Sequence, residues 1–196
     1  MKIARYSVFE RSRDTDPFRL VDLDIGAQDP ILIFDHPALL ADLVHGFARR
    51  RFAIELEPGD SVVFLGLGAV RISAVEGWRV TTSDFLTELR DARAYLRGEP
   101  TSLDRCLAAF LATVTTPSES HRERLQQTLD AVPRHLRQFM LGHMDRRHGP
   151  MLELIEAKDL AAHAALIRAD PDFSNIFKPG SKFNANGPFE AHILGV

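Results

Sequence analysis

The spacing of the apolar residues changes near residue 83, and this change constrains the fold more than any other feature of the sequence. Before it, apolar and polar residues alternate, as in half-buried strands, whereas after it apolar residues recur every three or four positions, as in amphipathic helices. A run of strands followed by a run of helices indicates the α+β class. We therefore predict a β-rich segment at residues 1–82, a helical bundle at residues 83–169 and an irregular C-terminal arm at residues 170–196.

Several segments before residue 83 have the composition of strands and are separated by turn signals. The alternation is clear in residues 18–25 (FRLVDLDI), and the strongest β propensity lies in residues 61–65 (SVVFL). Residues 57–60 (EPGD) are typical of a tight turn. The other predicted strands are residues 2–10, 31–34, 52–56, 69–75 and 78–82. Together they predict a small, mostly antiparallel sheet.

One helix is expected within the β-rich segment, and His36 and Pro37 open it. Asp35 can cap this helix, Pro37 suits its first turn, and the arginines at 49–51 favour the negative end of its dipole. Its apolar face is formed by Leu39, Leu40, Leu43, Val44 and Phe47. The three arginines allow two interpretations, an anion site or a solvated helix end, of which we favour the helix end.

The region after residue 83 predicts a series of helices joined by short connections, which is typical of antiparallel neighbours in a bundle. The first ends at Gly98, the fourth extends to Arg147 before the Gly149-Pro150 stop, and the last reaches Ala169. The last segment is either one continuous helix or two helices that meet near Lys158. The predicted starts are Ser83, Thr101 or Ser102, Ser120 with Glu123 at capping-box spacing, Pro133 and Met151.

The C-terminal arm combines helix-breaking residues with phenylalanines. Prolines and glycines recur through it and prevent a long regular element. Its apolar residues are too numerous for a disordered tail. They are Phe173, Phe177, Phe183, Phe189 and Ile193. We expect these side chains to dock on this chain or on a neighbouring molecule.

Composition excludes several classes of function. The net charge of -3 gives no electrostatic reason to expect nucleic acid or an anionic membrane as a partner. The single cysteine, Cys106, excludes an intrachain disulfide and a cysteine-based zinc cluster, and it favours the reducing cytoplasm. The N-terminus lacks the apolar run of a signal peptide, and no window has the roughly 20 apolar residues of a membrane span. We therefore expect a cytoplasmic protein.

Two glycines after the strongest predicted strand raise the question of a nucleotide loop. Gly66 and Gly68, with Asp84 further along, suggest a dinucleotide or S-adenosylmethionine site. Arg71 occupies the third glycine position, however, and too few residues separate Gly68 from Gly77 for a crossover helix. A glycine bend in a β-meander is the preferred interpretation.

The densest group of ionisable residues lies in residues 131–150 (AVPRHLRQFMLGHMDRRHGP). Within it, His143, Asp145 and His148 form an HxDxxH pattern, which is one way to bind a metal ion. On one helix Asp145 and His148 share a face while His143 continues an apolar stripe, so a packed histidine is preferred and neither metal nor cofactor is expected. The candidate ligand-binding residues are Arg134, His135, Arg137, His143, Asp145 and His148.

No catalytic set is apparent elsewhere in the chain. The sequence contains no GxSxG elbow, no P-loop and no HExxH motif. Cys106 lies within an apolar helix face, where a thiol is an inert packed group rather than a nucleophile.

The helical part resembles a known family. Residues 83–150, through Asp104-Arg105-Cys106, the run AVPRHLRQFMLGHMD and the Gly149-Pro150 stop, are similar to an uncharacterised helical region of bacterial proteins. That family is sometimes joined to NADAR-type domains, which resemble enzymes that cleave N-glycosidic bonds of ADP-ribose-like or riboflavin-precursor substrates. Its usual LGDMDxKD is LGHMDRRH here, so His143 and His148 depart from the pattern. No NADAR catalytic segment is found, and that activity is not carried over.

These observations lead to a non-catalytic cytoplasmic module that binds a partner protein or forms a homo-oligomer. The alternative is an enzyme or sensor for a nucleotide-like, ADP-ribose-like small molecule, with the polar groups of residues 134–148 lining a pocket that the arm closes. Nucleic-acid binding through the arginines at 49–51 and 146–147 is disfavoured by the acidic net charge.

Overall fold

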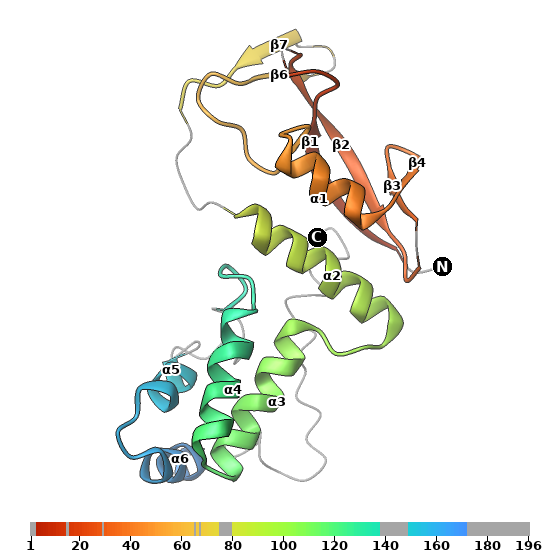
Figure 1. Cartoon of the computed structure of the whole chain (residues 1–196). Coiled ribbons are helices and arrows are strands. Elements are labelled where there is room, and N and C mark those ends of the chain that lie inside the picture. The colour runs from red at the N-terminus through yellow and green to blue at the C-terminus, as the bar shows by residue number, and fades with distance from the viewer. Residues whose placement is uncertain are drawn as a thin grey trace. The chain divides into compact units, whose positions relative to one another are not determined.

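A computed structural model describes residues 3–14, 16–28, 30–64, 66, 68–74, 80–137 and 149–171, and most of its elements are labelled in Figure 1. The described residues fall into two compact units, the first ending at Glu99 and the second beginning at Pro100. The first holds a sheet and two helices, and the second holds helices alone. This arrangement confirms the predicted α+β class, while the predicted domain limits at 82 and 169 stay predictions.

The sheet of the first unit is built around one long hairpin. Strands β1 (Ala4–Glu10) and β2 (Phe18–Ile25) pair antiparallel over the whole length of β1, from Ala4 opposite Ile25 to Glu10 opposite Arg19. The strand order is β4 (His36–Ala38), β3 (Ile31–Ile33), β2, β1 and β5 (Phe52–Ala53). Strand β6 (Ser61–Phe64) also pairs with β2 and with β7 (Gly68–Arg71). The β2–β6 pairing is parallel and the other pairings are antiparallel, which confirms the mostly antiparallel sheet.

Four of the shorter strands agree with the sequence in position but not in length. They are β3 (Ile31–Ile33), β5 (Phe52–Ala53), β6 (Ser61–Phe64) and β7 (Gly68–Arg71). The predicted turn at 57–60 is confirmed, because the Asp60 amide donates to the Glu57 carbonyl at 3.0 Å. Strand β6 turns directly into antiparallel β7, with positive φ at Gly66 and Gly68, which confirms the glycine bend.

The helix expected to begin at His36 and Pro37 begins later, and this prediction was wrong. Residues 36–38 form strand β4, reached from β3 by a turn with positive φ at Phe34 and Asp35. Helix α1 (Leu40–Ala48) follows, and its N-cap is Leu39 rather than Asp35. The physical reason is local: a residue before proline disfavours helical backbone, so His36 is extended and available for strand pairing.

Helix α2 (Thr82–Arg97) closes the first unit and packs through Phe85, whose ring makes an edge contact with Tyr6 at 5.7 Å between centroids. Its cap is Thr81, whose hydroxyl accepts from the Asp84 amide, so the prediction of Ser83 was wrong. Residues 80 and 81 are not in a strand and Thr82 is helical, which corrects the described part of the strand predicted at 78–82. Residues 75–79 lie outside the described residues. Gly98 ends α2 in the left-handed conformation, as predicted.

The second unit consists of α3 (Ser102–Thr115), α4 (Glu119–Asp130), α5 (Gly149–Glu156) and α6 (Leu160–Ala169). Helix α3 packs against α4 and α6, and Figure 1 shows α3 and α4 side by side. The hydrophobic core of the second unit includes Phe110, Leu125, Leu129, Met151, Leu154 and Ala164. None of the described helices is long and apolar enough to cross a membrane.

Several helix ends in the second unit differ from the prediction. Thr101 caps α3, which settles one of the two predicted alternatives, but Ser118 rather than Ser120 caps α4. Asp159 caps α6, so the last predicted helix is two helices. Helix α5 begins at Gly149-Pro150 rather than at the predicted Met151, because proline fits a first helical turn, where its missing N–H would have had no partner. The end of the predicted fourth helix at Arg147 lies outside the described residues.

Cys106 is fully buried in the core of the second unit. Its Sγ lies 4.0 Å from Sδ of Met151. Burial raises the pKa of the Cys106 thiol to about 11, which disfavours the reactive thiolate. Its placement confirms the prediction of a packed thiol.

Candidate functional site

A cleft of about 930 Å³ in the first unit is the candidate site. Helix α1 with the segment that follows it, the β3–β4 hairpin, and the ends of β1 and β2 contribute to its walls. Its ionisable side chains are Glu10, Arg19, His36, Asp42, His45, Arg49 and Arg51. Three arginines face two carboxylates, so the cleft has an excess of positive charge although the chain is acidic overall.

A buried carboxylate orients two of these arginines. Glu10 Oε2 accepts from Arg19 Nη2 at 2.7 Å and Nε at 3.2 Å, and Glu10 Oε1 accepts from Arg51 Nη2 at 3.1 Å. Sheet pairing sets this geometry, because Glu10 stands opposite Arg19 on β2 and opposite Phe52 on β5. Both arginine side chains remain more than half exposed, so each still offers N–H groups to a ligand.

The backbone at the end of α1 decides which of the arginines at 49–51 line the cleft. The Arg50 amide donates to the Phe47 carbonyl, and the Arg51 amide donates to the Gly46 carbonyl, which is the hydrogen-bond pattern of a Schellman motif. This motif places Arg50 in the left-handed conformation, with φ +54°. As a result, Arg49 and Arg51 line the cleft, whereas Arg50 does not.

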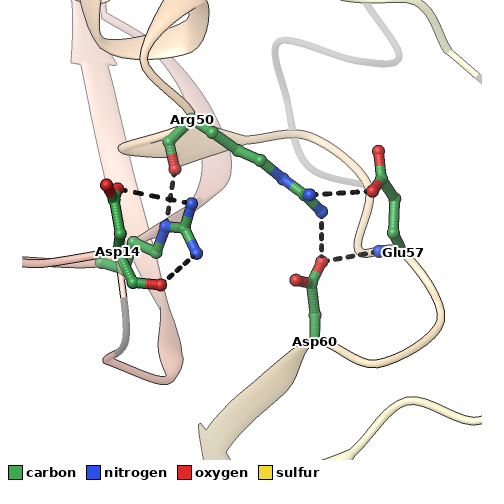
Figure 2. A network of polar contacts seen from close by, with 5 residues as sticks. Asp14, Arg50, Glu57 and Asp60 are labelled. Carbon is green, nitrogen blue, oxygen red and sulfur yellow. Dashed lines mark hydrogen bonds and ion pairs between the residues drawn. The ribbon is translucent and has the colours of Figure 1, made fainter.

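Arg50 has a structural role. Figure 2 shows its guanidinium between two carboxylates, 2.8 Å from Glu57 Oε2 and 2.7 Å from Asp60 Oδ2. Its carbonyl accepts from Arg11 Nε at 2.9 Å. These contacts join the end of α1 to the turn at 57–60 and to the end of β1.

Arg49 is a third cation of the cleft that can bind a ligand. In the part of the chain that the structure describes, its guanidinium makes no hydrogen bond or ion pair. The same holds for the imidazoles of His36 and His45, and all three side chains are exposed. A guanidinium is a strong donor for carboxylates and phosphates, so this wall of the cleft is suited to an anion.

Phe34 lies on the cleft with an unusual backbone. Its side chain is 62% exposed, and its φ of +47° is rare for a bulky residue. The two-residue turn that it forms with Asp35 is one in which asparagine and glycine are favoured. The Arg19 guanidinium lies 5.9 Å from the centroid of the Phe34 ring. Strained backbone at an exposed aromatic residue is a reason to look for a function.

The site residues predicted from the sequence lie elsewhere in the chain. Residues 133–137 make tight i to i+3 turns, which corrects the α-helix predicted to start at Pro133. Arg137 donates through Nε to the Val132 carbonyl at 3.0 Å and through Nη2 to the Asp130 carbonyl at 3.2 Å, so it closes the end of α4. The ligand-binding role of Arg134, His135 and Arg137 stays a prediction.

The remaining predicted site residues, His143, Asp145 and His148, lie outside the described residues. Within the described ranges, no group of three His, Cys, Asp or Glu side chains could hold a metal ion. Asp84, considered above as a ribose ligand, instead accepts from the Thr81 hydroxyl at 2.8 Å at the start of α2.

One feature of the sequence indicated the cleft, namely the run of arginines at 49–51, whose alternative interpretation was an anion site. The other cleft residues have no such signal, because strand pairing and a hairpin turn bring them together. A lone glutamate on a strand or a histidine before a proline does not predict a site.

Comparison with known proteins concerns the second unit. Residues 101–170, which include α3 to α6, are similar to a family described as a domain of unknown function (DUF7639). That description mentions neither NADAR-type domains nor an activity. No curated protein and no solved structure matches the chain. The candidate cleft therefore lies outside the residues that the family covers, and the similarity of this chain to that domain is confined to its helical unit.

Proposed function

We propose that this chain is a non-catalytic cytoplasmic module whose first unit binds an anionic ligand in the cleft. The observation that carries the proposal is the Arg49 guanidinium, which has no hydrogen bond or ion pair with the described residues. It lines the same cleft as Arg19 and Arg51, which Glu10 already orients. A preoriented arginine loses less side-chain entropy on binding than a free one, so these groups favour affinity.

The chemistry of the cleft favours binding over catalysis. Arginine stays protonated at ordinary pH and therefore does not act as a general acid or base. Both carboxylate oxygens of Glu10 already accept hydrogen bonds from guanidinium groups, so Glu10 acts in the cleft by holding Arg19 and Arg51 in place. The single buried cysteine of the chain supports a cytoplasmic location.

Pyrophosphate is a suitable first probe, because it presents charged oxygens without an apolar part. Titration calorimetry is expected to show binding that weakens with added salt, since exposed charges are screened. Arg49→Gln should weaken it about tenfold, which corresponds to about 1.4 kcal/mol. Arg71→Gln is the matched control, because Arg71 is an exposed arginine on β7 and does not line the cleft. Equal loss in both variants, or no binding to the wild type, contradicts the proposal.

A second candidate function is association with a partner protein or another copy of the chain. Among the described strands, β7 is hydrogen-bonded only to β6, so one of its edges is open. Val63, Phe64 and Val70 on this hairpin are 40%, 41% and 44% exposed. An open edge with apolar side chains is a common site of strand addition.

Association is tested by size-exclusion chromatography with light scattering. Val70→Lys is expected to shift a dimer toward the monomer mass, because lysine on an edge strand opposes pairing. A chain that ends at Asp170 separates the contribution of the arm, of which residues 172–196 lie outside the described residues. A wild-type chain that stays monomeric at high concentration contradicts self-association. Binding of a partner protein must then be weakened by Val70→Lys for the second candidate function to stand.

The nucleotide-like alternative has a different basis. It rests on the resemblance of residues 83–150 to a bacterial family sometimes joined to NADAR-type domains. The pocket would be formed by residues 134–148, of which the structure describes residues 134–137. Screening nucleotides, ADP-ribose and divalent metals by thermal shift tests it, because a ligand that binds the folded state raises Tm.

A further inference from the structure

We infer that the ligand of the cleft is a planar aromatic ring that carries an anionic group, with the ring stacked on Phe34 and the anion bound by Arg49. This inference rests on the proposed function and adds the chemical class of the ligand. Phe34 and Arg49 both line the cleft, the first from the β3–β4 turn and the second from the end of α1.

Both the exposure and the backbone conformation of Phe34 are unfavourable for the stability of the folded chain. An apolar ring gains free energy by leaving water, yet 62% of this side chain is exposed. Its left-handed backbone is also unfavourable for a bulky residue. The surrounding structure fixes this conformation, because the Phe34 amide donates to the Asp22 carbonyl at 3.0 Å and Ile33 pairs with His36. A stacked ligand would cover the exposed ring.

The arginines complete a site for a ring. The Arg19 guanidinium, 5.9 Å from the ring centroid and held by Glu10, is a planar cation that can itself contact an aromatic ligand. Stacking of a base on an aromatic side chain strengthens binding by about 5- to 150-fold in other proteins. An anion on the same ligand would then engage Arg49, which has no partner among the described residues.

The size of the cleft also favours a ligand larger than a bare anion. A volume of about 930 Å³ lies within the range found for small-molecule sites, roughly 300–1,000 Å³. A lone phosphate or carboxylate would leave most of this space to water. The anionic group of the ligand is a phosphate or a carboxylate, because both can accept paired hydrogen bonds from a guanidinium.

The test compares ligands that differ only in the ring. Adenosine 5′-monophosphate and ribose 5-phosphate share the phosphate, and indole-3-acetate and acetate share the carboxylate. Calorimetry on the wild-type chain is expected to give about tenfold tighter binding for at least one ring-bearing member of these pairs. The pair that shows the difference identifies the anion.

Two variants separate binding from stability. Phe34→Gly removes the ring and permits positive φ, so it should raise Tm by about 2–4 °C while abolishing the advantage of the ring-bearing ligand. Asp35→Gly relaxes the neighbouring residue of the same turn and keeps the ring, so it should raise Tm similarly and leave that advantage intact. Retention of the advantage in Phe34→Gly overturns the inference.

The outcomes also distinguish this inference from the proposed function. If ring-bearing and ring-free ligands bind equally and Arg49→Gln weakens both, the aromatic class is wrong and the anion cleft stands. If no anion binds in an Arg49-dependent way, both are wrong.

Discussion

Replacing Glu88 with glutamine is expected to raise the free energy of unfolding of the first unit at pH 8 by about 3 kcal/mol, the value that follows from the pKa of Glu88. Glu88 lies on α2 and is 7% exposed. Its burial, and then the nearby charges of Asp84 and Asp91, raise its pKa from 4.5 to about 7. Ionised Glu88 is therefore unfavourable in the folded chain, and glutamine is a neutral residue of the same shape.

The direction in which stability changes with pH follows from the number of protons that Glu88 binds in the folded and the unfolded state. Below pH 4.5 Glu88 is protonated in both states, so the wild type loses nothing. Between pH 4.5 and about 7 the folded state keeps a proton that the unfolded state has released, so stability falls as the pH rises. Above that window the loss is complete, at about 1.4 kcal/mol per pKa unit.

Urea denaturation of the wild type and of Glu88→Gln at pH 4 and pH 8 measures this effect. The two chains should have nearly equal stability at pH 4, and Glu88→Gln should be the more stable at pH 8. Glu99→Gln, at an exposed glutamate just after α2, serves as control and should change stability by less than about 0.5 kcal/mol at either pH. A gain for Glu88→Gln that does not depend on pH would mean that ionisation of Glu88 is not its cause.

Replacing Gly46 with alanine is expected to lower the free energy of unfolding of the first unit by about 2 kcal/mol. A Cβ atom at Gly46 would lie 2.2 Å from Cδ2 and 2.5 Å from Cε2 of Phe52. The Phe52 ring is only 4% exposed and has little room to move. Helix propensity alone favours alanine by about 1 kcal/mol, so a measured loss would show that packing dominates.

Thermal or urea unfolding measures this loss, and a double-mutant cycle identifies its cause. Phe52→Leu shortens the side chain that the new methyl group meets, so the double variant should lose less stability than the sum of the two single variants. Gly26→Ala is the control, because the nearest atom to a Cβ there is the Gln28 carbonyl oxygen at an ordinary 3.6 Å. Simple additivity of Gly46→Ala and Phe52→Leu would contradict the proposed clash.

The sequence by itself determined the features that depend on neighbouring residues. Alternation predicted β2 with the limits that the structure has, Phe18 to Ile25. Gly98 predicted the end of α2, because glycine adopts the left-handed backbone there without strain. The interruption near Lys158 was a predicted alternative, and Asp159 caps α6 at that point. In each case, the residues that decide the structure lie within a few positions of it.

Helix starts show where local patterns fail. Several residues near each start of α2 and α4 can act as caps, and sequence reasoning chose Ser83 and Ser120 where the structure uses Thr81 and Ser118. The pattern of apolar residues fixes a helix face but not its first turn. Which hydroxyl caps the helix depends on how the preceding segment enters it.

Tertiary structure decided which residues form the cleft. The sequence predicted a site in residues 134–148, because ionisable residues are dense there, and that site stays a prediction. Of the cleft, the sequence indicated only the arginines at 49–51. The cleft unites Glu10, Arg19 and Arg51, which are far apart in the chain and meet because β1 pairs with both β2 and β5. Local spacing determines secondary structure, whereas strand register determines which distant side chains become neighbours.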